Sequence, residues 1–374
     1  MPPPSDAPQP SRRVGVRLAV SLGIGAGFAW MLARGGLPIV PKREAFASLQ
    51  SWALPLYLVS LGLVHWFRAV RWRFLLRPVA KVGMAEILSS SFLGFAAILF
   101  LPLRMGEVVR PYLVSRRSAV RGWEAAGTVA AERVIDGLVL SLVLFVALAW
   151  TKPIDPLPDH VGDLSVPVSA VPHAAYAALA VFVSCFALMV LFYTSRTLVL
   201  RVIRSTLGVL SKRAADRAVQ ILERVVTGLR FLPSPRHLLP FLGETACYWG
   251  INAAGLWLLA QGCGLHAIGF GQACVVMGCI GIGILVHAGP GYFGTFQIAG
   301  YLALALYVAP AEVAVQGSAY VFLAYSAQLA QHLLGAVVGL WLERSRRSSG
   351  LPSARAVGYA SEHAPQHQRQ DSDG

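Results

Sequence analysis

LPLRMGEVVRPY, residues 101–112, places two arginines and a glutamate between two long apolar runs. A second charged group follows at Glu132-Arg133-Val134-Ile135-Asp136 and opens another apolar run. An ionisable side chain at membrane depth costs about 2.5–3.5 kcal/mol on insertion scales, so such groups usually face a protein interior or a polar cavity. The two charged groups therefore indicate a membrane protein that handles a polar or charged molecule.

Composition places the chain among polytopic membrane proteins. Hydrophobic residues make up 56% of the 374 residues, charged residues make up only 13%, and the mean hydropathy is +0.59. Soluble domains carry about 25% charge, so we predict an all-α polytopic transmembrane helix bundle. The formal net charge of +14 is accompanied by no motif of nucleic-acid readout. The five cysteines lie in or beside apolar runs without metal-ligand spacing, and we expect no metal site.

Six apolar runs have the length of a membrane-spanning helix, which needs about 17–25 predominantly apolar residues. Two further stretches, 84–121 and 268–309, are each divided by residues that interrupt helices, because proline removes a backbone donor and glycine loosens the backbone. We predict two broken hairpins there, either re-entrant or fully spanning with kinks. The six full spans are predicted at 14–33, 52–68, 132–150, 173–194, 238–260 and 317–341.

Lysine and arginine set the predicted orientation, because cytoplasmic loops carry an excess of them. With the N-terminus inside, 27 of the 32 lysines and arginines fall on inside segments and four on outside segments, and the remaining one is Arg133. Both termini are then cytoplasmic, and the two broken hairpins enter from opposite sides. Hairpins of opposite orientation are typical of inverted repeats, which place a binding site near the midplane where broken helices meet.

The basic stretch 195–237 carries apolar residues at helical spacing on one face. It predicts a cytoplasmic amphipathic helix on the anionic leaflet surface; the compatible alternative is a helical linker packed on the bundle. The flanking segments 1–13 and 344–374 are predicted to be disordered, so one membrane domain covers 14–343. The apolar positions of the basic stretch are Ala215, Ala218, Val219, Leu222, Val225, Val226 and Leu229.

The charged residues of the first break are candidates for binding a phosphate. Arg104, Glu107 and Arg110 are three residues apart and share one side of a helix. Guanidinium groups bind phosphate oxygens in a bidentate manner, and a helix N-terminus near Leu103 would add free N–H groups. We expect Arg104 and Arg110 to contact the ligand, with Glu107 holding an arginine or meeting a cationic group. The alternative is a charged loop that only fixes the topology.

Two further groups complete the predicted site. Glu132, Arg133 and Asp136 share one side of a helix, where they form either an internal ion-pair network that includes Arg104 and Arg110, or the far wall of a polar cavity. At the second break a helix opens after glycine and proline, and its N–H groups face either a polar ligand or a simple kink. The residues selected at the second break are Pro290, Gly291, Gly294 and Gln297.

The chain has no recognisable catalytic constellation. It lacks a G-x-S-x-G elbow, a Walker loop, an H-E-x-x-H helix and a Rossmann fingerprint. We therefore expect no enzymatic activity, no cofactor and no ATP hydrolysis by this chain.

At these residues the chain resembles the transmembrane, flippase-like region of the lysylphosphatidylglycerol synthase family. The family's Pro-x-Arg-x-Gly-Glu-x-x-Arg segment is matched by residues 102–110, and its Glu-Arg-x-x-Asp segment by residues 132–136. A late Pro-Gly-x-x-Gly segment is matched from Pro290 to Gly294, with Phe296 after it and Gln297 in place of the usual glutamate. The resemblance covers roughly 14–343 and implies an inner-membrane protein that binds or moves lipids. Aminoacyl transfer is not expected, because the soluble transferase domain of the full synthases does not follow the last span.

We therefore expect a flippase-like protein of the bacterial cytoplasmic membrane that binds and translocates a lipid with a polar, phosphate-bearing head group. The expected partners are membrane lipids and the anionic leaflet surface, with an envelope-biosynthesis enzyme as a further partner and no nucleic acid. Two alternatives remain open: a membrane-embedded transferase that modifies lipids, and a non-transporting partner in an envelope-lipid or glycan synthesis complex. If the function is transport, Arg104→Ala should abolish it without loss of membrane insertion.

Overall fold

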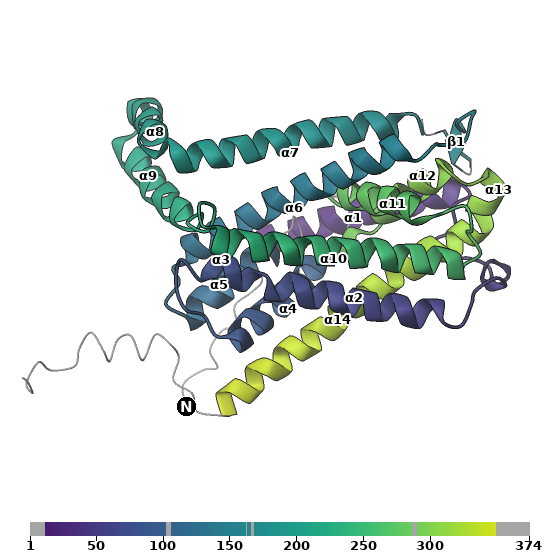
Figure 1. The fold of residues 1–374 in the computed structure, drawn as a ribbon, viewed down its shortest axis with the longest axis horizontal. Helices are drawn as coiled ribbons and strands as arrows, with labels where there is room; N and C mark the ends of the chain where they lie inside the picture. The colour runs from purple at the N-terminus through teal and green to yellow at the C-terminus, as the bar shows by residue number, and fades with distance from the viewer. Residues whose placement is uncertain (1–11, 102–105, 162, 166–167, 286–289, 349–374) are drawn as a thin grey trace, which may run out of the picture.

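The computed structural model describes residues 12–101, 106–161, 163–165, 168–285 and 290–348. Within these ranges the protein is an all-α bundle, as predicted, and the strands found there are β1 (His160–Val161) and β2 (Leu164–Ser165) (Figure 1). The two strands pair antiparallel, with His160 opposite Ser165. They belong to the connection between the two long helices α6 and α7.

Each of the six predicted spans corresponds to a long helix. In the part of the chain that the structure describes, four segments are long and apolar enough to cross a membrane: Ala53–Leu76, Gly122–Trp150, Ala170–Thr194 and Pro310–Arg346. The helices at the predicted spans are α1 (Arg12–Arg34), α2 (Ala53–Val70) followed by α3 (Trp72–Leu76), α6 (Gly122–Trp150), α7 (Ala170–Thr194), α10 (Pro235–Gly262) and α14 (Ser318–Ser348). Three short elements precede two of them: η1 (Arg43–Phe46), α13 (Pro310–Glu312) and the π-helical η4 (Val313–Gly317).

Two of the helical segments extend beyond the predicted spans, and both extensions carry charged residues. The span predicted to end at residue 68 continues to Leu76, because Arg71 keeps helical dihedrals and donates its N–H to Phe67 O at 3.0 Å. The span predicted to begin at residue 132 begins at Gly122, where the Glu124 carboxylate accepts the Arg121 N–H at 3.1 Å and caps the helix start. Charged residues that the prediction puts at or beyond the ends of these spans therefore lie within helical segments.

The two predicted broken stretches each form a pair of packed helices. The first pair is α4 (Met84–Phe100) with α5 (Gly106–Arg117), and the second is α11 (Phe270–Gly283) with α12 (Thr295–Ala305) after the short turn η3 (Pro290–Tyr292). Figure 1 shows α5 at the end of the bundle that carries α3 and α9, and α12 at the end that carries β1. The turn η3 packs against α4. The two hairpins thus come from opposite ends and meet inside the bundle.

Glycine permits the close approach in each hairpin. A Cβ atom on Gly106 would lie 2.2 Å from the backbone nitrogen of Ile98, so α5 can start against the α4 backbone only with glycine. Gly294 has φ +90°, a region that favours glycine. Its N–H donates to Gln297 Oε1 at 2.7 Å, which caps the first turn of α12.

The basic stretch forms two helices, α8 (Arg196–Leu210) and α9 (Lys212–Thr227), at one end of the bundle (Figure 1). Helix α9 packs on α6, and Ala215, Val219 and Val226 on its apolar face are buried. The prediction of a helical linker packed on the bundle is therefore confirmed. Arg213 and Arg217 are exposed, and contact of this segment with an anionic leaflet stays a prediction.

Candidate functional site

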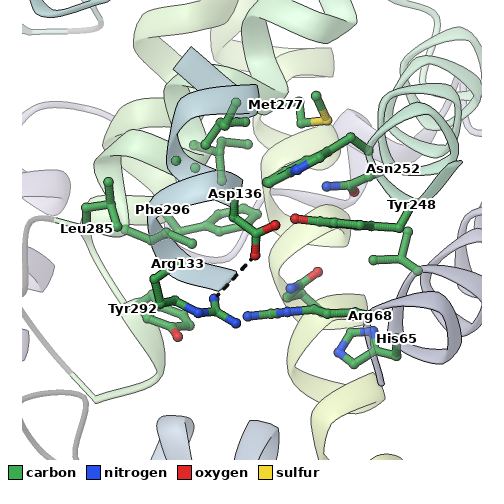
Figure 2. Close-up of a pocket in the computed structure, with 18 of the residues that line it drawn as sticks. His65, Arg68, Arg133, Asp136, Tyr248, Asn252, Met277, Leu285, Tyr292 and Phe296 are labelled. Atoms are coloured by element: carbon green, nitrogen blue, oxygen red, sulfur yellow. Dashed lines mark ion pairs between the residues drawn. The ribbon is translucent and has the colours of Figure 1, made fainter. Parts of the chain in front are cut away.

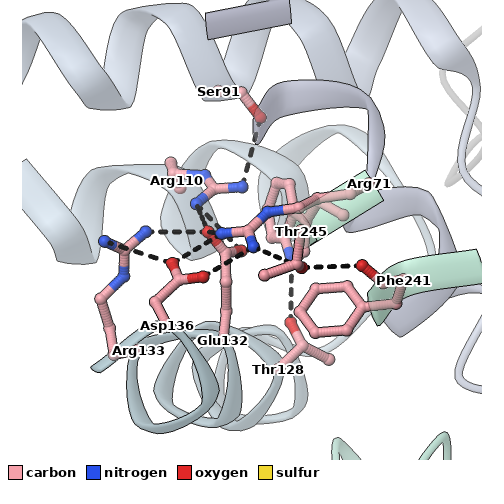
Figure 3. A network of polar contacts seen from close by, with 10 residues as sticks. Arg71, Ser91, Arg110, Thr128, Glu132, Arg133, Asp136, Phe241 and Thr245 are labelled. Atoms are coloured by element: carbon pink, nitrogen blue, oxygen red, sulfur yellow. Dashed lines mark hydrogen bonds and ion pairs between the residues drawn. The ribbon is translucent and has the colours of Figure 1, made fainter. Parts of the chain in front are cut away.

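Five charged side chains form a buried network where α3, α5 and α6 meet (Figure 3). Arg71 lies between α2 and α3 and donates to both carboxylate oxygens of Asp136, at 2.6 Å each, and to Glu132 at 3.1 Å. Arg110 of α5 donates to Glu132 at 3.0 and 3.2 Å. Arg133 donates to Glu132 at 2.8 Å and lies 4.0 Å from Asp136. Three guanidinium groups thus share two carboxylates, which leaves the network positive.

Aromatic rings and a hydroxyl hold the two deepest arginines. The guanidinium carbon of Arg71 lies 4.5 Å from the ring centroid of Tyr248, and its NH1 donates to Thr245 at 2.8 Å. The guanidinium carbon of Arg110 lies 4.3 Å from the ring centroid of Trp72. A desolvated cation over an aromatic ring gains about 2 kcal/mol, so these rings offset part of the cost of burying each charge.

Glu132 is the centre of this network. It is fully buried and accepts hydrogen bonds from arginines on three different helical segments. A buried charge without partners is strongly destabilising, whereas one with several charge-assisted hydrogen bonds is tolerated. The network therefore fixes the broken hairpin α4–α5 against α3 and α6, and its carboxylates are committed to guanidinium groups.

A cavity of about 280 Å³ lies beside the network, between α2, α6, α10, α11, α12 and α14 (Figure 2). One wall is charged or polar and includes Arg68, Arg133 and Asp136. Aromatic side chains, among them Tyr248 and Trp249 of α10, form part of the boundary. The remaining lining residues are largely apolar and include Leu140, Met277, Ile280, Ile284, Leu285 and Phe296. The cavity is therefore amphipathic.

Two arginines dominate the polar wall. Figure 2 shows the guanidinium groups of Arg68 and Arg133 pointing toward each other. Arg133 has its carboxylate partners on α6, whereas Arg68 packs over the ring of Phe95, with its guanidinium carbon 4.5 Å from the centroid. Within the described ranges no carboxylate lies at ion-pair distance from Arg68.

Several donors on the polar wall lack acceptors. The Nε atoms of Arg68 and Arg133 and the Nε1 atom of Trp249 are buried and make no hydrogen bond with the part of the chain that the structure describes. Buried polar groups in proteins are nearly always paired, and an unpaired group calls for an explanation such as a ligand or a water. All three atoms carry N–H donors. An anion rich in acceptor oxygens would satisfy them.

The structure places the residues predicted at the first two motifs in two layers. Glu107, Arg133 and Asp136 line the cavity. Arg110 and Glu132 lie behind that wall in the buried network, so the predicted ion pair between Arg110 and the second motif is confirmed. The predicted contacts of these residues with a ligand stay predictions. Arg104 lies outside the described residues.

The second break contributes mainly through its backbone and its aromatic residues. Gly291 and Gly294 adopt positive φ angles of 65° and 90°, and Pro290 begins η3. Tyr292 and Phe296, which flank Gly294, line the cavity. Gln297 faces back to the start of α12 as its cap. The break thus shapes the cavity wall, and binding of a ligand by its N–H groups stays a prediction.

Sequence reasoning missed the arginines that matter most at this site. The lysine and arginine count assigns Arg68 and Arg71 to an inside segment, because they lie at the end of an apolar run. The signal that could have found them is their spacing of three on one helical face, within the aromatic sequence Trp66-Phe67-Arg68-Ala69-Val70-Arg71-Trp72. Aromatic rings on both sides of an arginine are unusual in a plain topology signal and typical of a stacked, buried cation.

Comparison with known families shows to which family the chain belongs. Residues 17–330 match the model of the lysylphosphatidylglycerol synthase TM region, which covers most of the chain. The protein therefore belongs to this family, and the predicted resemblance is confirmed. No curated protein and no solved structure shows significant similarity to it. The family supports a multi-pass integral membrane protein related to lipid handling.

Proposed function

We propose that this protein binds a lipid through a phosphate-bearing head group and translocates it across the bacterial cytoplasmic membrane. The observation that carries the proposal is the pair of guanidinium groups, Arg68 and Arg133, that point toward each other on one cavity wall (Figure 2). Two cations that face each other repel unless an anion lies between them. A phosphate group has the charge and the acceptor oxygens that both arginines bind.

The shape and polarity of the cavity support a lipid rather than a free anion. The apolar side, which includes Met277 and Ile284, would contact the first methylene groups of acyl chains while the head group lies at the arginines. Ligand pockets range over about 300–1,000 Å³, and the cavity, at about 280 Å³, has the size of a head group rather than of a whole diacyl lipid. In the proposed complex the acyl chains stay largely in the bilayer.

The hairpins supply an element that can move. The turn η3 and the end of α4 meet beside the cavity, and Tyr292 of η3 lines it. Binding sites of transporters with inverted repeats lie where broken helices meet, and access alternates when one repeat rocks against the other. We propose that the two hairpins part on alternate sides of the bound head group.

The state of the carboxylates favours transport over a transferase reaction. A general base needs a carboxylate that is able to accept a proton from the substrate. Glu132 is held by three arginines, and Asp136 accepts two 2.6 Å hydrogen bonds from Arg71. These carboxylates are already satisfied by cations, so we propose that the lipid leaves the protein chemically unchanged.

A leaflet-exchange assay in proteoliposomes tests the proposal. Fluorescent anionic and zwitterionic phospholipids are added, and the wild type is compared with Arg68→Gln and with Arg68→Lys. The control is Arg73→Gln, because Arg73 pairs with Glu244 at 2.7 Å and does not line the cavity. A hydrogen bond to a charged group contributes about 1.5–3 kcal/mol, so Arg68→Gln should lower apparent affinity about 10- to 100-fold.

The outcomes distinguish three possible functions: lipid translocation, a transferase reaction and a non-transporting partner role. Exchange that is lost in Arg68→Gln, partly kept in Arg68→Lys and unchanged in Arg73→Gln would support translocation through this cavity. Equal exchange in all four proteins would refute the role of Arg68. A lipid product of altered mass would favour the transferase. Absence of exchange with every phospholipid would favour a non-transporting partner of an envelope-biosynthesis complex.

A further inference from the structure

Two histidines form a pair on the wall of the same cavity. His65 of α2 and His332 of α14 both line it, and their ring centroids are 4.7 Å apart with the planes nearly perpendicular. His65 is 2% exposed and His332 is 3% exposed. His65 lies one helical turn before Arg68, and Figure 2 shows the two side chains next to each other. The pair is therefore adjacent to the proposed anion position.

Backbone hydrogen bonds define the tautomer of both rings. His65 Nδ1 lies 2.9 Å from the carbonyl oxygen of Leu61, and His332 Nδ1 lies 2.7 Å from that of Gln328. A carbonyl only accepts, so each Nδ1 carries a proton, and each Nε2 of a neutral ring is an acceptor. His65 Nε2 is buried and makes no hydrogen bond with the described residues.

The surroundings control whether either ring can take a proton. The Arg68 cation lies one helical turn from His65, and the ring of Phe95 on α4 packs against both, with its centroid 5.9 Å from that of His65. A proton on either histidine adds a positive charge near the Arg68 cation, and two protonated rings at 4.7 Å would also repel each other. The other titratable groups that line the cavity are Tyr57, Glu107, Arg133, Asp136, Tyr248 and Tyr292.

An anion bound at Arg68 would instead favour the uptake of a proton by one of the two histidines. Its negative charge compensates the added proton, and a new Nε2–H donor on His65 would find an acceptor oxygen close by. We infer that the His65–His332 pair takes up one proton when an anionic head group binds at Arg68, so that the lipid and a proton bind together. This inference rests on the proposed function and deepens it, because it makes the proton a second substrate of the same cavity.

Thermodynamic linkage between the proton and the anion determines how the affinity for the anion changes with pH. If binding takes up one proton, affinity for the anion rises as pH falls, by up to about tenfold per pH unit, and is lost again as pH rises. Reciprocity also requires that the bound anion increases the affinity of the pair for the proton by the same factor. A proton gradient across the membrane would then bias the direction of lipid movement.

Calorimetry on the purified full chain in detergent micelles tests the inference. The probe is dihexanoyl phosphatidylglycerol, a phosphodiester whose single charge does not change between about pH 5.5 and 8. Titrations at pH 6.5 in two buffers of different ionisation enthalpy give the number of protons taken up per ligand bound. The expected result is close to one proton for the wild type, with affinity about tenfold higher per unit fall in pH.

Variants assign the proton to the pair. His65→Gln with His332→Gln should take up no proton on binding the probe, and its affinity should no longer rise as pH falls. The control His173→Gln, an exposed residue outside the cavity, should behave like the wild type throughout. Binding of the probe without proton uptake by the wild type would overturn the inference and leave the proposed function standing. Uptake that persists in the double variant would overturn the assignment to these histidines. No binding of the probe at any pH would contradict the proposed function and the inference together.

Discussion

Replacement of Arg71 by glutamine should destabilise the protein more than any surface change. Arg71 makes two 2.6 Å hydrogen bonds to Asp136, one to Glu132 and one to Thr245, and its side chain is fully buried. Without it, the ion-pair partner that remains for Asp136 within the described residues is Arg133, at 4.0 Å. Loss of one partner from a buried ion pair costs about 3–5 kcal/mol, which lowers the folding equilibrium constant roughly 100- to 4,000-fold.

The matched control is Arg73→Gln, two residues further along the same helical segment. Arg73 pairs with Glu244, but their side chains are 29% and 18% exposed, so its loss should cost about 1 kcal/mol or less. Equilibrium unfolding in mixed micelles, followed by tryptophan fluorescence, measures both values. Equal losses for Arg71→Gln and Arg73→Gln would refute the reasoning, because the buried network would then contribute no more than a surface ion pair.

Three further substitutions test how the hairpins are held. Gly106→Ala should reduce folded protein and transport because its Cβ would overlap the α4 backbone, whereas Gly243→Ala, with nothing within 4 Å, should be tolerated; both yields can be measured by size-exclusion chromatography in detergent. Glu86→Arg should destabilise the first turn of α4 by breaking its 2.6 Å pair with Arg346, and adding Arg346→Glu should restore part of the loss in a thermal unfolding assay. Gln297→Ala should cost about 1 kcal/mol by removing the cap of α12, while Gln297→Glu keeps the acceptor and should leave unfolding unchanged.

The helical architecture could be predicted from the sequence because hydropathy and helix breakers report directly on membrane helices. Gly106 begins α5, so the predicted division of the first broken stretch into α4 and α5 was correct. Pro111 was wrongly expected to break the helix there, because it lies within α5, and Pro102 lies outside the described residues. The positions 290–294 correctly divided the second. A span limit is harder to predict at a charged residue, because the same arginine can lie in a loop or within a buried network. Arg71 is such a case, and only the carboxylates of another helix decide it.

The site could be predicted only in part, because several of its ion pairs join residues on different helices. Arg133 and Asp136 pair within one helix, and this short-range contact follows from their spacing. The partner of Arg110 also lies in the expected motif, at Glu132. The cavity itself depends on α2, α10 and α14 coming together around α6. The pattern of residues within one segment cannot predict that arrangement. For the same reason the sequence could not predict the histidine pair, whose members come from α2 and α14.

The four arginines of the network and the cavity have different roles, because their carboxylate partners lie in different places. Arg71 and Arg110 have carboxylates and aromatic rings around them, so their charges are already compensated and they serve to hold helices together. Arg133 also has carboxylate partners, Glu132 at 2.8 Å and Asp136 at 4.0 Å, but its side chain is 26% exposed and lines the cavity. Arg68 has a ring but no carboxylate within the described part of the chain. The protein thus neutralises its most deeply buried arginines internally and leaves Arg68 to pair with a ligand. Of these four arginines, Arg68 is therefore the one whose loss should change lipid binding most and stability least.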